Sequence, residues 1–201
     1  MARRRPLDPP RVPESRLDGW RQIEDTTESV FDSLFVSVTA RTLVYEDERL
    51  RASLAETADV EFAPRFFFAS RIALDPTPPN SRMLDRMVSM RARDGFADRL
   101  RDRGFERVEN RRHRSYHIDG REGDLYRFDA ECRPDGVALS AAGLTVVWPD
   151  GDGYLFAGGA YPIAVGESPS DLTETERTAL EDRIDANAFR EELLELIRST
   201  E

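Results

Sequence analysis

Alternating apolar and polar positions predict strands in the first part of the chain. Within residues 35–47, the apolar positions 36, 38, 40 and 44 alternate with Ser37, Thr39 and Arg41, a pattern typical of a half-buried strand. Residues 65–74 (RFFFASRIAL) predict a further strand, which stops at the turn sequence DPTPPN. We expect the folded part to begin near residue 17, with a strand that places Trp20 in a core.

Two stretches in the first half have the spacing of amphipathic helices. In residues 47–58, Leu50 and Leu54 lie four positions apart, on one helical face. Residues 81–105 predict a longer helix that begins after a cap at position 80 or 81 and ends at Gly104. We interpret its apolar stripe as core filler; the stripe consists of Met83, Met87, Met90, Ala97 and Leu100.

Two hairpins and a final helix complete the pattern. Residues 106–119 turn through Asp119 and Gly120 into a strand at 124–132, and residues 138–148 turn at 150–153 into a strand at 153–162. Thr173 and Glu176 have the spacing of a capping box. The helix that they open carries apolar residues to position 197, with Asn187 as a candidate break.

This order of elements predicts an α+β fold. We expect a mostly antiparallel sheet of about six or seven strands, packed by helices on its faces, because long parallel crossovers are mostly missing. Residues 17–201 are expected to form one domain. Residues 1–16 are rich in Pro and Arg and lack periodicity, so we expect a flexible basic tail.

The charges point to the environment of the protein. The net charge is −10, all 29 basic residues are arginine, and Asp and Glu number 39. Acid excess without lysine favours a salt-rich cytoplasm, where like charges are screened. A GC-rich genome would also replace lysine by arginine, but it would not explain the excess of acids. No apolar run is long enough for an export signal or a membrane span, so we expect a cytoplasmic protein without a membrane partner.

Both histidines lie in the segment RRHRSYHIDG, residues 111–120. On a helix, His113 and His117 could share one metal ion, but on the predicted strand they lie roughly 13 Å apart, too far for one ion. We therefore expect exposed strand histidines, no metal and no cofactor. The alternative enzyme hypothesis is a small hydrolase that uses His117 with Asp119, although the sequence offers this pair no visible nucleophile.

The arginines of the same segment are a second candidate site. Arg111, Arg112 and Arg114 could bind a phosphate or a carboxylate, or form an RNA-binding surface. Residues 81–121 carry twelve Arg and seven Asp or Glu. Interleaved aspartates can pair with these arginines on a solvated face, and strong salt weakens phosphate binding. We favour the solvated face and expect no nucleic-acid partner.

The glycines of FAGGAYP, residues 156–162, interrupt a predicted strand. Glycine inside a strand indicates a bulge or the close approach of another group. A ligand lying against Gly158, Gly159 and Tyr161 is one interpretation. We favour the other, a bulge that turns Tyr161 into the core. Cys132 alternates with core positions and is expected to be buried and inert.

The chain resembles an uncharacterised family of small proteins from halophilic archaea. The resemblance rests on VYEDERLR, FFFASRI, the glycine-ended helix and AGGAYP, and it covers roughly residues 17–165. The order of elements is also similar to that of the PsbP-like fold, an antiparallel sheet between helices that binds protein partners. Neither resemblance implies a reaction or a functional residue. Our hypothesis is a non-catalytic binding or accessory domain, with a protein partner or a small ligand.

Overall fold

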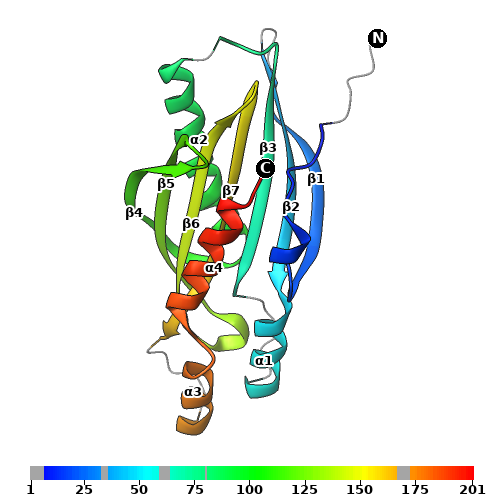
Figure 1. The fold of residues 1–201 in the computed structure, drawn as a ribbon. Coiled ribbons are helices and arrows are strands. Elements are labelled where there is room, and N and C mark those ends of the chain that lie inside the picture. Colours follow the sequence, from blue (N-terminus) through cyan, green and yellow to red (C-terminus); the bar gives the residue numbers. More distant parts are fainter. Residues whose placement is uncertain (1–6, 33–35, 59–63, 80, 167–172) are drawn as a thin grey trace.

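A computed structural model describes residues 7–32, 36–58, 64–79, 81–166 and 173–201. The strands form one antiparallel sheet (Figure 1), as the alternating patterns predict. The strands are β1 (Trp20–Asp32), β2 (Ser37–Asp47), β3 (Phe66–Asp75), β4 (Phe105–Ile118), β5 (Arg121–Cys132), β6 (Leu139–Asp150) and β7 (Gly153–Val165). The predicted fold class, an α+β fold with an antiparallel sheet of six or seven strands, is confirmed.

The strand order in this sheet is β1-β2-β3-β7-β6-β5-β4. Hairpins join β1 to β2, β4 to β5 and β6 to β7, while β3 pairs with the last strand, β7. The last strand of the chain, β7, therefore lies in the middle of the sheet. The strands β1 and β4 form its two edges.

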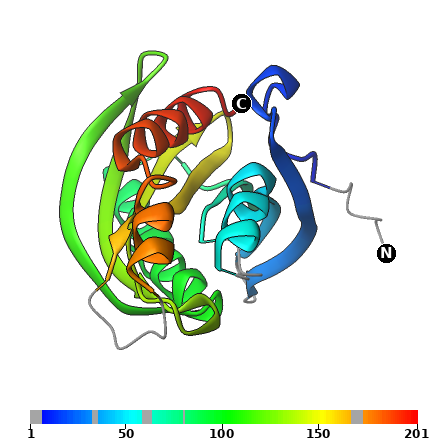
Figure 2. The ribbon, with the colours of Figure 1, turned by 90° about the horizontal axis from the view of Figure 1, so that it is seen from below.

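Helices cover both faces of the sheet (Figure 2). The helices are α1 (Glu48–Ala58), α2 (Arg82–Asp102), α3 (Glu174–Glu181) and α4 (Ala186–Arg198). Helix α2 packs Phe96 and Leu100 into the core on one face, and α4 packs Leu193 and Ile197 into the core on the other. Adjacent Phe66 and Phe67 point to opposite cores, because successive strand residues alternate between the faces.

The C-terminal helical region is divided in two. The capping box of Thr173 and Glu176 is present and opens α3. The chain then breaks at residues 182–185, where the side chain of Asp185 accepts hydrogen bonds from the backbone N–H groups of Asn187 and Ala188. The predicted break at Asn187 is therefore two residues late, because Asp185 caps the second helix.

The methionine stripe of α2 does not belong to the core. Met83, Met87 and Met90 are 85%, 54% and 47% exposed, whereas Phe96 and Leu100 are fully buried. The prediction that the methionines fill the core is wrong. The helix has two apolar stripes, and the one with the larger rings and branched side chains faces the sheet.

The glycines of β7 lie in regular strand. Gly158 pairs with Phe68 and Thr145, and Gly159 with Phe67 and Leu144, without a register shift. Neither has a positive φ. The bulge of this strand lies at Ile163 instead, between the pairs Ser140–Ala164 and Ala141–Pro162. The prediction of a bulge at the glycines is therefore wrong.

The predicted flexible segment, residues 1–16, is described from Leu7 onward. This described part runs beside the C-terminus, where the backbone groups of Arg11 and Glu201 exchange two hydrogen bonds of 2.6 and 2.8 Å. Pro10 is buried, and Val12 packs against the core under α4. The segment thereby forms one wall of the site described next.

Candidate functional site

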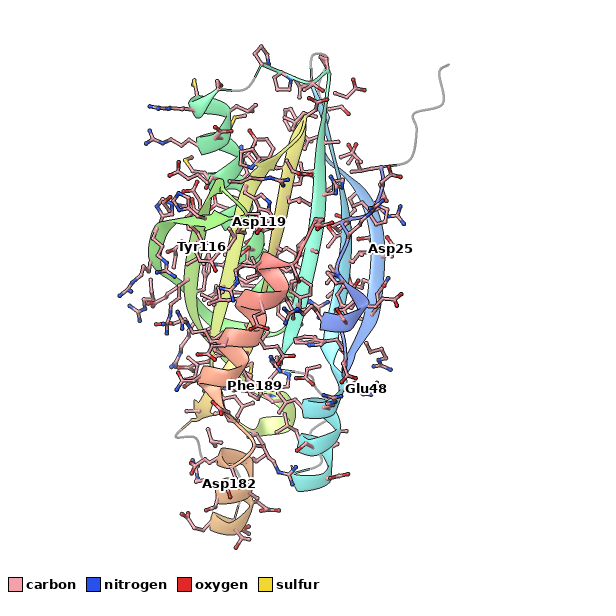
Figure 3. All side chains as sticks on the ribbon, in the orientation of Figure 1. Asp25, Glu48, Tyr116, Asp119, Asp182 and Phe189 are labelled. Atoms are coloured by element: carbon pink, nitrogen blue, oxygen red, sulfur yellow. The ribbon has the colours of Figure 1, made fainter. Side chains whose placement is uncertain are left out.

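A cavity of about 700 Å³ lies beyond the C-terminal end of α4. Here the helix no longer covers the sheet, and the N-terminal segment at Leu7–Pro9 and Arg11 lies opposite the turn between β4 and β5. Figure 3 labels Asp119 on that turn. Thr200 and Glu201 also line the cavity. Residues far apart in the sequence therefore meet at one place.

The sheet forms the floor of the cavity. Arg71 on β3 pairs with Leu155 on β7, which pairs with Trp148 on β6. Cross-strand partners share a face, and so do residues two positions apart on one strand. Asp150, two residues beyond Trp148, therefore projects from the same face. Arg71, Trp148 and Asp150 all line the cavity.

Asp150 links two arginines of the floor. Its Oδ2 accepts a hydrogen bond of 2.8 Å from Nη1 of Arg71, and its Oδ1 accepts one of 2.6 Å from Nη1 of Arg121. The Asp150 side chain is 19% exposed. Such charge-assisted bonds fix both guanidinium groups. They leave the remaining N–H groups of Arg71 and Arg121 able to bind a further acceptor.

Two donors of the floor are buried without a partner among the described residues. They are the indole Nε1 of Trp148 and the Nε of Arg71. Trp148 is 1% exposed, so bulk water does not reach its N–H group. A buried donor that makes no hydrogen bond costs about 1–3 kcal/mol.

Acidic side chains also line the walls of the cavity, outside its floor. Asp8 comes from the N-terminal segment and Asp119 from the turn after β4. Glu201 adds a third acidic side chain to the walls, and Arg11 adds a positive charge. A small molecule that carries a carboxylate could meet Arg71 or Arg121, and a cationic group on it could meet Asp8 or Asp119.

The described lining of the cavity holds one side-chain hydroxyl, that of Thr200. It contains no Cys, Ser or His, and the hydroxyl of Thr200 donates to the carbonyl oxygen of Leu196 at 3.0 Å. A nucleophile needs a neighbouring base that can take its proton. No His of the described lining could take a proton from Thr200.

The arginines singled out from the sequence lie elsewhere, on the edge strand β4. Arg111 is paired with Glu109 at 2.9 Å and with Asp129 at 3.2 Å. Arg112 faces Arg127 across the strand pair, and a register shift separates it from Asn110. Arg114 lies 5.8 Å from the ring centroid of Tyr116. The structure spreads the three arginines along an exposed strand and does not gather them around one ligand position.

The two histidines also lie on β4, as predicted. The ring of His113 stacks on Tyr126 with 4.6 Å between centroids, and its Nε2 is 2.7 Å from Oδ1 of Asp124. His117 is exposed and pairs across the strands with Glu122. Asp119 lines the cavity, whereas His117 does not. In the part of the chain that the structure describes, no group of three His, Cys, Asp or Glu side chains could hold a metal ion.

The candidates on β7 are covered by protein. Gly158, Gly159 and Tyr161 are buried. A Cβ added at Gly159 would collide with the carbonyl oxygen of Phe66 and would lie 3.0 Å from Cδ1 of Leu193 on α4. Burial raises the pKa of the Tyr161 phenol, which Arg127 and Arg190 partly counteract. The close approach that these glycines permit is made by β3, β6 and α4.

Sequence reasoning missed the floor residues, although it had a signal for one of them. In RFFFASRIAL, Arg71 follows Phe67 and Ala69 at period two, so a charge lies on a face that is otherwise apolar. Trp148 and Asp150 were interpreted only as the end of a strand and a turn. Their convergence with Arg71 depends on the pairing of β3 with β7, which joins segments about eighty residues apart.

Comparison with known proteins gives a family without an assigned activity. A family model described as a domain of unknown function (DUF6517) matches residues 9–201. No curated protein and no solved structure matches the chain. The similarity to the PsbP-like fold and the halophilic origin therefore stay expectations. Among the described helices, none is both long and apolar enough to span a membrane.

Proposed function

Because the chain belongs to the DUF6517 family, whose function is not assigned, we propose its function from the cavity: it is a non-catalytic domain that binds a small molecule through a carboxylate group. The observation that carries the proposal is the pair of guanidinium groups, Arg71 and Arg121, that Asp150 fixes at the cavity and whose side chains are 27% and 51% exposed. A carboxylate accepts hydrogen bonds from the remaining guanidinium N–H groups and gains from the positive charge of both arginines.

The arrangement of Asp150 supports a preformed site. This carboxylate is bonded to Arg71 and Arg121, so both arginines are held before a ligand arrives, and less conformational entropy is lost on binding. The cavity volume of about 700 Å³ lies within the range of small-molecule sites, about 300–1,000 Å³. The ligand is therefore expected to be of metabolite size rather than a polymer.

The test follows the indole N–H signals by two-dimensional NMR. The chain has two tryptophans, and a Trp148→Phe variant assigns the signal of Trp148. Acetate, succinate and glutamate are titrated as potassium salts against equal concentrations of KCl. We expect at least one carboxylate to move the Trp148 signal in a saturable manner and to leave the Trp20 signal in place.

Matched variants locate the binding. Arg71→Lys keeps a positive charge that can pair with Asp150 but removes the planar set of guanidinium donors, and should weaken binding at least tenfold. Arg112→Lys, on the exposed edge strand, should bind as the wild type does. If no carboxylate produces a saturable shift, or if Arg71→Lys responds as the wild type does, the proposed function is wrong.

A further inference from the structure

The exposed methionines of α2 form a surface that is separate from the cavity. Helix α2 lies on the face of the sheet opposite α4 (Figure 2). Met83, Met87 and Met90 follow one another at spacings of four and three residues, so they project from one side of the helix. With about 100° per residue, Met87 lies about 180° from the buried Phe96. Met83 and Met90 lie about 140° and 120° from Phe96 by the same count, so the stripe as a whole points away from the core.

Such a stripe is costly to leave in water. The three side chains are 85%, 54% and 47% exposed, although apolar burial would contribute roughly 25 cal/mol per Å². The core-facing side of this part of α2 is already filled by Leu84, Val88 and Ser89. The three methionines are not among the side chains that pack against this core, so core packing does not explain their position.

Arginines flank the stripe. Arg82, Arg86 and Arg91 are exposed on the same half of the helix, and no ion pair joins them to a described residue. The carboxylate of Asp85 faces inward and accepts a hydrogen bond of 2.8 Å from the hydroxyl of Tyr154. The outer surface of this half is therefore apolar and positive, on a protein whose net charge is −10.

We propose that the methionine stripe (Met83, Met87 and Met90) docks an acidic amphipathic helix of a partner protein. Methionine is unbranched and polarizable, and adapts to the apolar side chains of a docked helix. The flanking arginines select a partner of negative charge. Since the stripe is short, the interface belongs to the small and transient class. The inference does not depend on a ligand in the cavity.

The test measures the binding of designed helical peptides by fluorescence anisotropy, with the full chain as receptor. The probe is an eighteen-residue peptide with leucine at helical spacing and glutamate on its other positions. A scrambled peptide of equal composition tests the spacing, and a peptide with arginine in place of glutamate tests the charge. We expect the acidic helix to bind at least tenfold more tightly than either control peptide.

Two variants of the protein assign the contact. Replacing Met83, Met87 and Met90 by glutamine keeps length and helix propensity and should weaken binding at least tenfold. Arg101→Gln, on the same side of α2 but about three turns beyond the stripe, should have no effect. Arg71→Lys should also bind the peptide normally, which separates this inference from the proposed function.

Other outcomes would overturn the proposal. If none of the three peptides binds, or if the acidic and basic peptides bind equally, the protein does not select an acidic helix. If light scattering shows a dimer of the wild type and a monomer of the glutamine variant, the occupant is a second copy of this chain. If the scrambled peptide binds as tightly, charge alone explains the binding and the methionines are not a docking surface.

Discussion

The guanidinium of Arg65 lies 4.3 Å from the ring centroid of Phe189, at the start of α4. The ring of Trp20 lies 4.8 Å from the same guanidinium. Arg65 also donates hydrogen bonds to Asp47 and Glu192. One buried arginine therefore ties β1, the end of β2 and α4 together, at the opposite end of α4 from the cavity.

We predict that Arg65→Met destabilises the fold strongly. Arg65 is 3% exposed and its partner Asp47 is 6% exposed, so the variant leaves a buried carboxylate without its cation. Breaking a buried pair in this way costs about 3–5 kcal/mol. Urea unfolding followed by circular dichroism measures the loss. Arg16→Met removes an exposed pair with Glu195 and should cost less than about 1 kcal/mol; equal losses for both variants would contradict this account.

A second prediction concerns acid. Burial raises the pKa of Glu192, but hydrogen bonds from Arg65 and Trp20 outweigh burial, so the pKa lies below its ordinary value of 4.5. A carboxyl whose pKa is lower in the folded state stabilises the fold above the unfolded pKa, and this stabilisation is lost as pH falls through the folded pKa. The urea midpoint of unfolding, measured from pH 7 to pH 3, should therefore decrease once the pH drops below about 4.5.

The variant Glu192→Gln isolates this contribution. It should be less stable than the wild type at pH 7 and should lose less stability on acidification. Part of the loss will remain, because the hydrogen bond from Arg41 also lowers the pKa of Asp25. A Glu192→Gln variant with the same acid dependence as the wild type would show that Glu192 does not contribute.

The local elements of this fold were predictable because their signals are local. Alternation gave the strands, the Thr173–Glu176 spacing gave the start of α3, and Asp119-Gly120 gave a hairpin turn. The pairing of β3 with β7 was not predictable, since many strands have the same alternation and the choice between them depends on packing across the whole domain. The cavity depends on this pairing, so its residues could not be grouped from the sequence.

The burial of Met83, Met87 and Met90 was predicted wrongly for a different reason. Period alone predicts that Met83, Met87 and Met90 share one side of a helix, and it does not say which side faces the core. A second stripe, with Ala92, Phe96 and Leu100, is buried and occupies the sheet-facing side. The same ambiguity arises for any helix with two apolar stripes.

A third prediction concerns Gly159. Since its φ is not positive, conformational strain is not the reason for glycine here. An added Cβ would meet the Phe66 carbonyl oxygen and Leu193, and backbone in a central strand cannot move aside cheaply. We expect Gly159→Ala to cost at least about 1–3 kcal/mol, as overpacking does. Gly95→Ala, on α2 with no atom within 4 Å of the added Cβ, is the control and should be neutral or stabilising.

A fourth prediction concerns Cys132, the one cysteine of the sequence. Its side chain is 1% exposed, and burial raises the pKa of the thiol to about 12. The thiolate is the reactive form, so Cys132 should not react with a thiol reagent in the folded protein and should react once urea unfolds it. Rapid labelling without denaturant would contradict the burial. Cys132→Ser should cost about 1–3 kcal/mol if the hydroxyl finds no partner.

The last prediction is that the stability of the fold rises with salt. The chain carries 39 acidic and 29 basic residues, and the excess of like charge opposes the compact state until counterions screen it. At molar salt the Debye length falls to about 3 Å, shorter than most separations between surface charges. The urea midpoint should therefore be higher in molar KCl than in dilute buffer. An unchanged or lower midpoint would contradict the interpretation of the acid excess.

Glu181→Gln with Asp182→Asn removes two exposed acids at the C-terminal end of α3, where negative charge also opposes the helix dipole. This variant should be more stable than the wild type in dilute buffer and should gain less stability from KCl.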